Sequence, residues 1–526
     1  MFLRSGSAYK IILSITFILI AIPCALLLLH PAAIFPDASW GFQVWRSMQN
    51  GSGFNMITQV SHTNIATNVE EFKSWWSPGQ YLVPGAFQKL FGLDLGHASS
   101  LTTIICQFSG LAGLYAFFKK AGFSKIISAL SILIIALQQS FLTPFIFYNG
   151  GEVLLFGFIG WFLYGCLSFT KPGIVLVVFV LLSGWIGFFA KSSFLWMYGA
   201  GLLFIWIKLS KHTREIKTWL VNGLWIGVPA VISFAVIYLT YISRGVNPSS
   251  ASGGLDFSLK VFAFPLASPL LAGFSFDDIA NGFIFHNDAV IFSPGQAVAI
   301  IAILAIVSLL LIYFICKKVP NKRYAVLLAI FYAAAVLFFG SAFLRKLDIS
   351  FEARHFRTVG LLTIPGAVYL FSRAAKVYRI AFGLMVAITA FFGLKFYILS
   401  HIALRTEAVH STSGIAQQFA DKETMDYLRM LDNHNNNAVF VFFSPDMGLE
   451  INHNRSITLD PLGRDISINM DDYTYKGHGG PVYILMPHNY IGIRANVLLK
   501  CFPGYKGFSL KELSDDYVLY YATEAR

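Results

Sequence analysis

Several charged residues stand next to apolar segments of this chain, where ionised side chains are costly unless they are paired or wet. Asp37 follows the first apolar segment, and Glu152 opens a later one. Lys191 lies in a turn between two apolar segments, and Arg354 and His355 lie just before another. A carboxylate can accept a proton from a hydroxyl, and cations can neutralise a phosphate. These residue types could therefore act as a base and as contacts to an anion.

Each of these residues also has a structural interpretation. Asp37 fits a turn or a cap, and Glu152 fits a helix N-terminus, where an acid complements the dipole. Lys191 could extend to lipid headgroups. Glu352, which stands just before Arg354, could simply form an ion pair with a neighbouring arginine. The sequence leaves both interpretations open at each position.

Apolar helices must position these residues. The chain has 526 residues, of which 56% are hydrophobic and 13% charged, and its mean hydropathy is +0.63. Charged residues are thus about half as frequent as in an ordinary soluble domain. A bilayer crossing needs roughly 20 apolar residues. We expect a polytopic α-helical membrane protein with about eleven transmembrane helices: Ile11–Leu29, Leu101–Phe118, Ile126–Leu142, Val153–Phe169, Ile174–Ala190, Phe194–Ile207, Trp219–Tyr241, Val298–Ile315, Tyr324–Phe343, Val359–Phe371 and Ile380–Leu399.

Basic residues in short connections indicate which side of the membrane is cytoplasmic. In this chain they cluster after alternate predicted helices, on the same side as the N-terminus. The clusters are Arg4 and Lys10; Lys119, Lys120 and Lys125; Lys171; Lys208, Lys211, Arg214 and Lys217; Lys317, Lys318, Lys322 and Arg323; and Arg373, Lys376 and Arg379. We therefore expect a multi-pass protein of the cell inner membrane with a cytoplasmic N-terminus. The long connections 30–100, 242–297 and 344–358 and the C-terminal region then lie outside.

The net charge of +12 does not indicate nucleic-acid binding. The basic residues stand in clusters between apolar runs, where they usually orient helices. Cys501 is the only one of the five cysteines outside the apolar runs. A disulfide framework in the polar part is therefore excluded.

Polar, mixed sequence after about residue 400 predicts a second domain. Its pattern indicates a helix at Ile415–Leu431, strands at Ala438–Phe443 and Val482–Met486, a helix at Ile491–Lys500 and a strand at Tyr517–Tyr521. We expect residues 1–400 to form the transmembrane domain and residues 401–526 a small, soluble, periplasmic α/β domain. The glycine-rich segment Lys476–Gly480 matches no phosphate-binding loop and is interpreted as a turn.

The first outer connection, residues 30–100, is far longer than a typical loop. It contains an aromatic, amphipathic stretch from Trp75 to Gly92 that is suited to the headgroup plane and could hold a lipid substrate. Trp76, Gln80 and Tyr81 are the candidate contacts in this stretch. Glu70 and Glu71 lie just upstream and could supply acids, with solvated surface as the alternative.

Five short motifs occur in order along about the first 400 residues. They are Asp37 after the first helix, the surface helix Ser77–Gly92, Glu152 at the start of the fourth span, the turn Phe189–Ser193, and Glu352–Phe356 before the tenth span. In this order they resemble the GT-C class of membrane glycosyltransferases, which includes the aminoarabinose transferases and protein O-mannosyltransferases. The sequence departs from the aminoarabinose type at Trp75, Trp76 and Ser77, where those enzymes have an acidic and a basic residue.

The resemblance implies an enzyme that depends on a polyprenyl-phosphate-linked sugar. Such an enzyme moves a hexosyl or pentosyl group from the lipid carrier to a lipid, glycan or protein acceptor at the outer face of the membrane. Asp37 would then be the general base and Glu152 a second catalytic carboxylate. The expected contacts to the donor phosphate or sugar are Lys191, Arg345, Arg354, His355 and Arg357.

Two other functions stay open at this stage. A transporter or flippase for a lipid-linked saccharide would place charges midway along several spans, and here the interiors are nearly charge-free. A non-catalytic assembly protein would use its C-terminal domain for binding. We identify no cofactor: His62, His97, His286 and Asp288 match no metal-ligand spacing, although a divalent metal stays an alternative.

Overall fold

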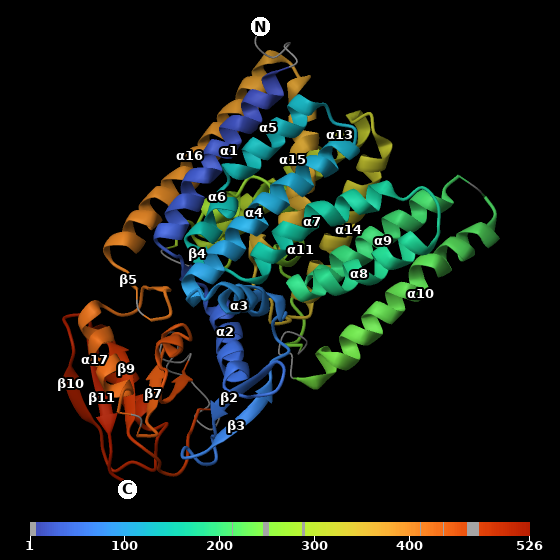
Figure 1. The fold of residues 1–526 in the computed structure, drawn as a ribbon. Coiled ribbons are helices and arrows are strands. Elements are labelled where there is room, and N and C mark those ends of the chain that lie inside the picture. Colours follow the sequence, from blue (N-terminus) through green and yellow to red (C-terminus); the bar gives the residue numbers. More distant parts are fainter. Residues whose placement is uncertain are drawn as a thin grey trace. The chain divides into compact units, whose positions relative to one another are not determined.

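The computed structural model describes residues 7–212, 214–245, 252–286, 290–410, 412–434, 436–459 and 473–526 (Figure 1). By their contacts the residues form two compact units. Unit 1 consists of Met1–Leu26, Thr102–Ile146 and Gly151–Ser400. Unit 2 consists of Leu27–Leu101, Phe147–Gly150 and His401–Arg526. Unit 2 thus combines the first long connection with the C-terminal region.

Unit 1 is built of helices. Ten of the eleven apolar segments that the sequence indicates fall on single helices, whereas Ile126–Leu142 is broken after Ala136 into two helices. Helices α1, α4 and α16 continue into unit 2. The helices are α1 (Ala8–Leu29), α4 (Leu95–Lys120), α5 (Lys125–Ala136), α6 (Gln139–Leu142), α7 (Gly151–Ser168), α8 (Ile174–Ala190), α9 (Phe194–Ser210), α10 (Ile216–Thr240), α11 (Leu259–Leu271), α12 (Phe276–Ile279), α13 (Pro294–Lys318), α14 (Lys322–Leu344), α15 (Arg357–Ser372) and α16 (Lys376–Thr406), with 3-10 turns η2 (Thr143–Phe145), η3 (Ile242–Arg244) and η5 (Ala353–Phe356).

Among the described residues, seven helices are long and apolar enough to cross a membrane. An eighth crossing would be the pair Lys125–Ala136 and Gln139–Phe145, which is bent by 68°. Helices α8, α9 and α11 are apolar but shorter. The count of eleven crossings therefore stays a prediction.

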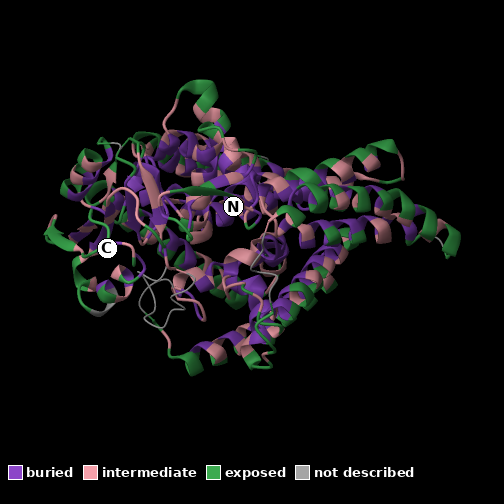
Figure 2. Ribbon diagram, turned by 90° about the horizontal axis from the view of Figure 1, so that it is seen from below, coloured by how far each residue is buried: buried purple, intermediate pink, exposed green. Residues whose placement is uncertain are grey.

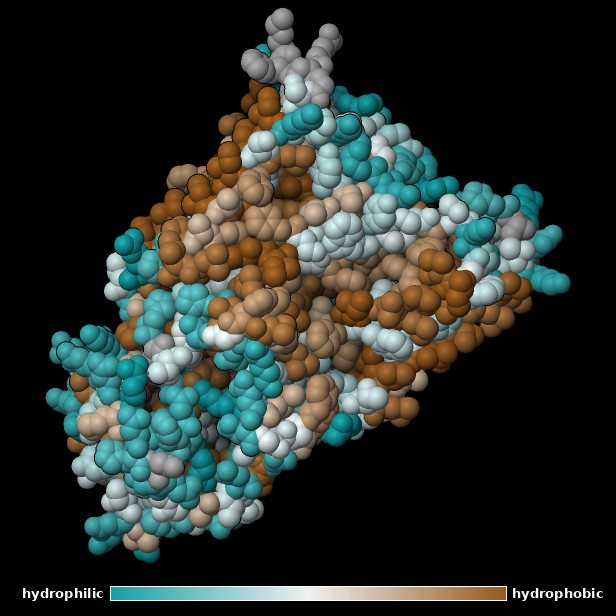
Figure 3. All heavy atoms as spheres, viewed as in Figure 1, coloured by the Kyte–Doolittle hydropathy of each residue, from teal (hydrophilic) through white to brown (hydrophobic). Residues whose placement is uncertain are grey.

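The surface of unit 1 is apolar, as lipid contact requires. Helix α10 leaves Leu220, Leu224, Val231 and Leu239 more than 60% exposed. Many helices carry exposed residues along one side and buried residues along the other (Figure 2). On the face shown in Figure 3, hydrophobic residues cover much of unit 1 and hydrophilic residues cover most of unit 2.

Helix α11 was not predicted and is buried within unit 1. It packs most extensively against α13 and also contacts α14 and α15. Val261, Phe264 and Leu271 have almost no exposed surface. The sequence pattern does not reveal α11, because thirteen residues are too few for a crossing and two prolines interrupt the run.

Unit 2 contains a five-stranded mixed sheet in the order β10-β11-β9-β7-β8. The middle strand β9 pairs in parallel with β7 and antiparallel with β11. The expected strands and the second helix are present. The strands are β7 (Val439–Phe442), β8 (Arg455–Thr458), β9 (Val482–Pro487), β10 (Ser509–Glu512) and β11 (Tyr517–Ala522), with helices α17 (Lys422–Asp432) and α18 (Ile493–Leu499).

Both faces of this sheet are buried because its side chains alternate between two helices. Val441, Ile484 and Val518 pack on the face that Leu498 of α18 covers. On the other face, Phe440 and its neighbours contact Leu428 of α17. The result is a three-layer α/β arrangement.

Three details of the C-terminal prediction were wrong. The first helix begins at Lys422 rather than Ile415, because Asp421 caps it by accepting a hydrogen bond from the Thr424 amide (2.7 Å). Residues Ala416–Gln417 upstream form strand β6 instead. Strands β8 and β10 were missed, and all four residues of β10 are exposed, so that no apolar alternation marks it.

The first long connection also folds within unit 2. Val60 and Ile65 from it join the apolar core beside β7 and β9. The predicted surface helix is α3, which Gly92 ends in the left-handed conformation. The remaining elements of unit 2 are β1 (Ala33–Ile34), α2 (Pro36–Gln49), β2 (Met56–Val60), β3 (Asn68–Phe72), α3 (Gly79–Phe91), β4 (Phe147–Tyr148), β5 (Val409–His410), β6 (Ala416–Gln417), and 3-10 turns η6 (Met447–Glu450) and η9 (His488–Tyr490).

Asp446 in unit 2 predicts a pH-dependent stability. Burial raises the pKa of Asp446 to about 6, although the Ser444 hydroxyl donates a hydrogen bond to it. The carboxyl group of Asp446 therefore binds a proton more tightly in the folded chain than in the unfolded chain. The protonated Asp446 favours folding at low pH, and this contribution to the free energy of unfolding is lost as pH rises from about 4 to above 6. Asp446→Asn should stabilise the protein at pH 7.5 by up to about 3 kcal/mol and much less at pH 5. The apparent unfolding temperature of the detergent-solubilised chain at both pH values measures this.

Asp426→Asn, which changes an exposed carboxylate, is the control and should have no effect at either pH. An equal change at both pH values in the Asp446 variant would contradict the assignment.

Candidate functional site

Glu152 and Lys191 form a short ion pair within unit 1. Glu152 stands in the first turn of α7, and Lys191 is the C-cap residue of α8. The Lys191 Nζ lies 2.5 Å from Glu152 Oε1, and the side chains are only 17% and 19% exposed. A Cβ at Gly151 would lie 3.1 Å from the Ala190 carbonyl oxygen, so the two helix ends are in close contact. Glycine therefore allows the approach that joins the two charges.

Arg354 adds a second cation to this pair. It lies in η5, and its Nη1 is 3.7 Å from Glu152 Oε1. The same guanidinium contacts Glu352 Oε2 through Nη2 at 2.9 Å and through Nε at 3.0 Å. Two carboxylates thus face two cations, and the group of four has no net charge. We call Glu152, Lys191, Glu352 and Arg354 the charge cluster.

His355 stands beside the charge cluster as a neutral imidazole. Burial and the charges of Arg354 and Lys191 hold the pKa of His355 well below its usual range. The Ser350 hydroxyl donates its proton to Glu352 and lies 3.3 Å from His355 Nε2. Because that hydroxyl has no second proton, Nε2 must carry the hydrogen of the imidazole. The lone pair of the ring is therefore on Nδ1, which can accept a hydrogen bond.

The segment that carries Arg354 and His355 is held by Asp277 of α12. Asp277 accepts hydrogen bonds from the Ala353 amide (2.8 Å) and the Phe283 amide (3.1 Å). Burial, and next the charge of Asp278, raise the pKa of Asp277 to about 7. The sequence-based candidates do not include this residue, although two adjacent acids at 277 and 278 in the long connection 242–297 are a signal that could have identified it.

Arg357 is engaged in a separate ion pair. Its Nη2 lies 2.7 Å and 3.0 Å from the two carboxylate oxygens of Asp278. Its Nη1 is buried and has no hydrogen-bond partner. Arg345 is exposed at the C-terminal end of α14. The structure thus joins Lys191 and Arg354 to Glu152, places His355 near both cations, and leaves Arg357 and Arg345 outside the charge cluster.

Asp37 lies in unit 2 as the second residue of α2, directly after Pro36. It is partly exposed. A carboxylate in the first turn interacts favourably with the positive end of the helix dipole.

Gln80 and Tyr81 are packed inside unit 2, only 4% and 2% exposed. The Tyr81 hydroxyl donates to Asn55 Oδ1 (2.5 Å), and the Gln80 carbonyl accepts from the Tyr148 hydroxyl (2.6 Å). These contacts hold the first turn of α3. The surface of this helix is formed by other residues, among them Leu90, which is 73% exposed.

The other candidates in the first connection have ordinary surroundings. Glu70 is exposed in β3, and Glu71 forms an ion pair with Lys73 (3.1 Å). Trp76 packs against Trp75 with 5.4 Å between the ring centroids. Glu70 and Glu71 fit the alternative of a solvated surface, whereas Trp76 is partly buried.

Where the structure describes the chain, no group of three or more His, Cys, Asp or Glu side chains is placed to hold a metal. His62 stacks on Tyr475, and His97 pairs with Asp94 at 2.7 Å. Asp288 lies outside the described residues.

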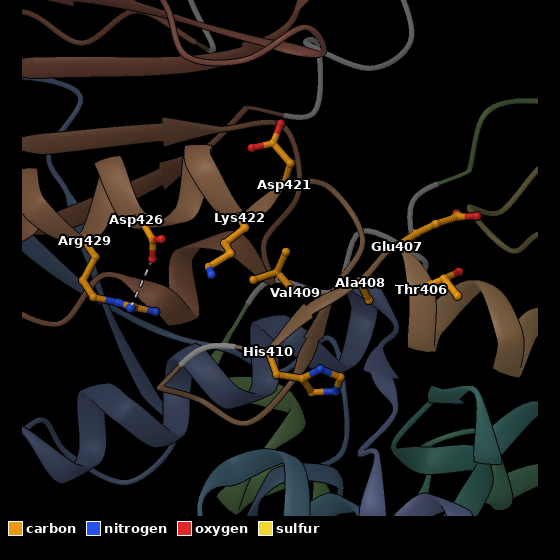
Figure 4. A pocket seen from close by; sticks show the side chains of 9 residues that line it. All are labelled: Thr406, Glu407, Ala408, Val409, His410, Asp421, Lys422, Asp426 and Arg429. Carbon is orange, nitrogen blue, oxygen red and sulfur yellow. Dashed lines mark ion pairs between the residues drawn. The ribbon is translucent and has the colours of Figure 1, made fainter.

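A pocket of about 560 Å³ lies in unit 2 beside α17 (Figure 4). Lys422, Asp426 and Arg429 line it from one side of that helix, and Arg429 pairs with Asp426 at 3.5 Å. Thr406, Glu407, Ala408, Val409, His410 and Asp421 complete its wall. It contains none of the residues that the sequence indicates for chemistry.

The fold is similar to that of known membrane glycosyltransferases. ArnT from Cupriavidus metallidurans, solved with bound undecaprenyl phosphate, matches with a TM-score of 0.52 and 12% identity over 98% of each chain. The mycobacterial arabinofuranosyltransferase AftD matches with a TM-score of 0.46 and 12% identity, and the chain covers 40% of its length. An oligosaccharyltransferase from Archaeoglobus fulgidus matches with a TM-score of 0.43 and 12% identity, over 94% of this chain and 72% of its own.

No protein-family model matches the sequence, and no curated protein matches it either. At this identity the similarity to ArnT shows the fold alone. Together with the apolar helices, it makes the chain a polytopic helical membrane protein with a GT-C-like fold. The resemblance seen in the sequence is confirmed at that level.

The charge cluster predicts strong coupling between its two closest members. Lys191→Met removes the shorter contact to Glu152 and leaves a poorly compensated carboxylate at a helix start, which should lower stability by on the order of 3 kcal/mol. Glu152→Gln/Lys191→Met removes both charges and should recover most of this loss. Apparent unfolding temperatures of the single and double variants in detergent measure the coupling. If the stability losses of the two single variants simply add up in the double variant, the ion pair between Glu152 and Lys191 is contradicted.

Proposed function

We propose that this chain is a glycosyltransferase that takes a sugar from a polyprenyl-phosphate-type carrier at the outer face of the inner membrane. The acceptor would be a lipid, a glycan or a protein. The observation that supports this most directly is the charge cluster with its neutral histidine, in a chain of GT-C-like fold. A phosphate leaving group needs cations, and Lys191 and Arg354 are held together here.

The proposed reaction is a displacement at the anomeric carbon of the sugar. The acceptor oxygen forms the new bond to that carbon while the bond from the carbon to the phosphate oxygen breaks. The bonding electrons leave with the phosphate, and Lys191 and Arg354 neutralise the charge that it gains. Asp37 takes the proton of the acceptor hydroxyl as general base.

The carboxylates of the charge cluster keep both cations in place before the donor binds. An unpaired lysine or arginine in an apolar helical unit would be costly, and Glu152 and Glu352 remove that cost. When a phosphate arrives, the cations can exchange part of these contacts for phosphate oxygens. Arginine is suited to this exchange because its fork binds two oxygens at once.

His355 is proposed to bind a hydroxyl rather than the phosphate. A neutral imidazole offers no positive charge, but its Nδ1 lone pair can accept a hydrogen bond. Sugars present hydroxyl donors. We therefore assign His355 to the sugar of the donor.

The proposal also includes the topology. The N-terminus is cytoplasmic, residues 1–400 form the transmembrane domain, and residues 401–526 form a domain on the outer side. The positions of Lys191 and Arg354, on the side opposite the basic clusters, support this orientation, because a phosphate partner explains their exception to the usual distribution of positive charge.

Asp37→Asn and Arg354→Ala should each lower sugar transfer at least tenfold, the general scale for losing a base or a charge contact. Neither variant should lower the yield of folded protein in membranes. Transfer from a defined polyprenyl-phosphate-linked sugar in membrane preparations measures both effects.

Matched controls are Asp515→Asn and Arg405→Ala, which change exposed residues of the same types. Both controls should retain wild-type transfer. Full activity in both Asp37→Asn and Arg354→Ala would reject the proposed site.

Two substitutions at His355 distinguish its ring nitrogens. An asparagine amide can present an acceptor near the position of Nδ1, whereas a glutamine amide reaches the position of Nε2 near Ser350. We expect His355→Asn to retain most of kcat/KM and His355→Gln to lose roughly three- to tenfold, the scale of one hydrogen bond. The reverse order, measured in the same transfer assay, would contradict the assignment of the lone pair.

A further inference from the structure

Helix α2 carries Asp37 at its first turn and Arg46 at its last turn. Its start is set by the backbone: the Phe35 amide donates to the Tyr148 carbonyl at 3.0 Å. Further along, side chains set the rotation of the helix about its axis: the Trp45 indole donates to Gln88 of α3 (2.8 Å), and the Ser47 hydroxyl accepts from the Thr58 amide of β2 (3.1 Å). Two side chains of α2, Gln43 and Arg46, reach the C-terminal region of the chain within unit 2.

Arg46 binds the carbonyl groups that end the 3-10 turn η6. Its Nη1 donates to the Gly448 carbonyl (2.8 Å) and to the Ile451 carbonyl (2.5 Å), and its Nη2 donates to the Leu449 carbonyl. A helix end leaves such carbonyls short of amide partners, and the Gly448 carbonyl also accepts a hydrogen bond from the Ile451 amide (3.4 Å). The carboxylates of Glu450 and Asp432 stabilise the guanidinium charge nearby. One side chain of α2 thus satisfies three backbone groups of η6 and the residue after it.

Gln43 adds a contact one turn earlier on the same side of α2. Its Nε2 donates to the Pro445 carbonyl at 2.6 Å. The fit is close, because a Cβ at Gly448 would lie 2.9 Å from that Nε2. Residues three apart on a helix share one side. Gln43 and Arg46 therefore fix which side of α2 faces η6.

The segment that Arg46 binds is itself held from the other side. Asp432, at the end of α17, accepts hydrogen bonds from the amides of Asn452 (2.7 Å), His453 (3.1 Å) and Asn454 (3.0 Å). The carbonyl groups of this segment therefore accept hydrogen bonds from Arg46 of α2, and the amides that follow donate hydrogen bonds to Asp432 of α17. Because the α/β region holds this segment in place, the segment can fix the orientation of α2.

We propose that Arg46 is a positioning residue, through which the C-terminal region orients α2 and with it the carboxylate of Asp37. This inference rests on the proposed function, in which Asp37 is the base. A helix of fourteen residues is a stiff rod of about 20 Å, so a rotation set at its last turn is carried to its first. The C-terminal region then acts on the rate of transfer, in addition to any partner that it binds.

The test compares Arg46→Met, which keeps the length of the side chain without its donors, with Arg46→Lys, which keeps the charge without the fork. We expect Arg46→Met to lower kcat about 10- to 100-fold, the scale of a displaced catalytic group, with KM for the lipid-linked sugar unchanged. Arg46→Lys should fall between this variant and the wild type. Rates are normalised to folded protein after detergent extraction and size exclusion.

The double variant Asp37→Asn/Arg46→Met separates positioning from general damage. If Arg46 acts through Asp37, the double variant is no slower than Asp37→Asn alone. Arg429→Ala, which breaks an exposed pair in the same unit, is the control and should keep wild-type kcat. If Arg46→Met does not fold, Gln43→Ala replaces it in the same comparison.

Each outcome has a clear consequence. Wild-type kcat in Arg46→Met with a loss in Asp37→Asn would overturn the positioning role and leave the proposed function intact. A double variant that falls by the product of the two single losses would also overturn it. Full activity in Asp37→Asn would instead reject the base of the proposed function, and the inference about Arg46 with it.

Discussion

The charge cluster of unit 1 depends on mutual compensation. Glu152 opens an apolar helix, where an isolated carboxylate would be expensive, and Lys191 and Arg354 make it tolerable. Glu352 then balances the second cation. Four ionised groups can persist together in an apolar unit because their charges cancel, and the helix ends that carry them must stay in register for this to hold.

Ordinary packing contacts supply that register. Gly151 lets the start of α7 approach the end of α8, and Asp277 holds the backbone of η5 through the Ala353 amide. A Cβ at Gly360 of α15 would lie 2.6 Å from the Gly273 amide nitrogen, directly after the unpredicted helix α11. The segments around η5 are therefore held by the short Asp277 side chain and by close approach of backbones rather than by long flexible side chains. Such rigidity is what a site that stabilises a developing charge requires.

Unit 2 is assembled from distant parts of the chain by a similar principle. The first connection supplies α2 and the β2–β3 hairpin, and the C-terminal region supplies the sheet. In the segment Gly448–Asn454, carbonyl groups bind Arg46 and amide groups bind Asp432, although these two residues are almost 400 positions apart in the sequence. A region that the sequence predicts as a separate domain is thus connected to the helix that carries Asp37 in its first turn.

The sequence by itself determined the helices, because a run of apolar residues long enough to cross a bilayer satisfies its backbone only as a helix. It also identified Glu152, Lys191, Arg354 and His355 as residues of chemical interest, because charges are rare beside such runs. Only the tertiary structure decided that Lys191 pairs with Glu152, that Arg357 pairs with Asp278 instead, and that Gln80 and Tyr81 are buried. It also decided that α11 exists and that α17 begins at Lys422. These outcomes depend on contacts between residues far apart in the chain, which local patterns of hydrophobicity and charge do not encode.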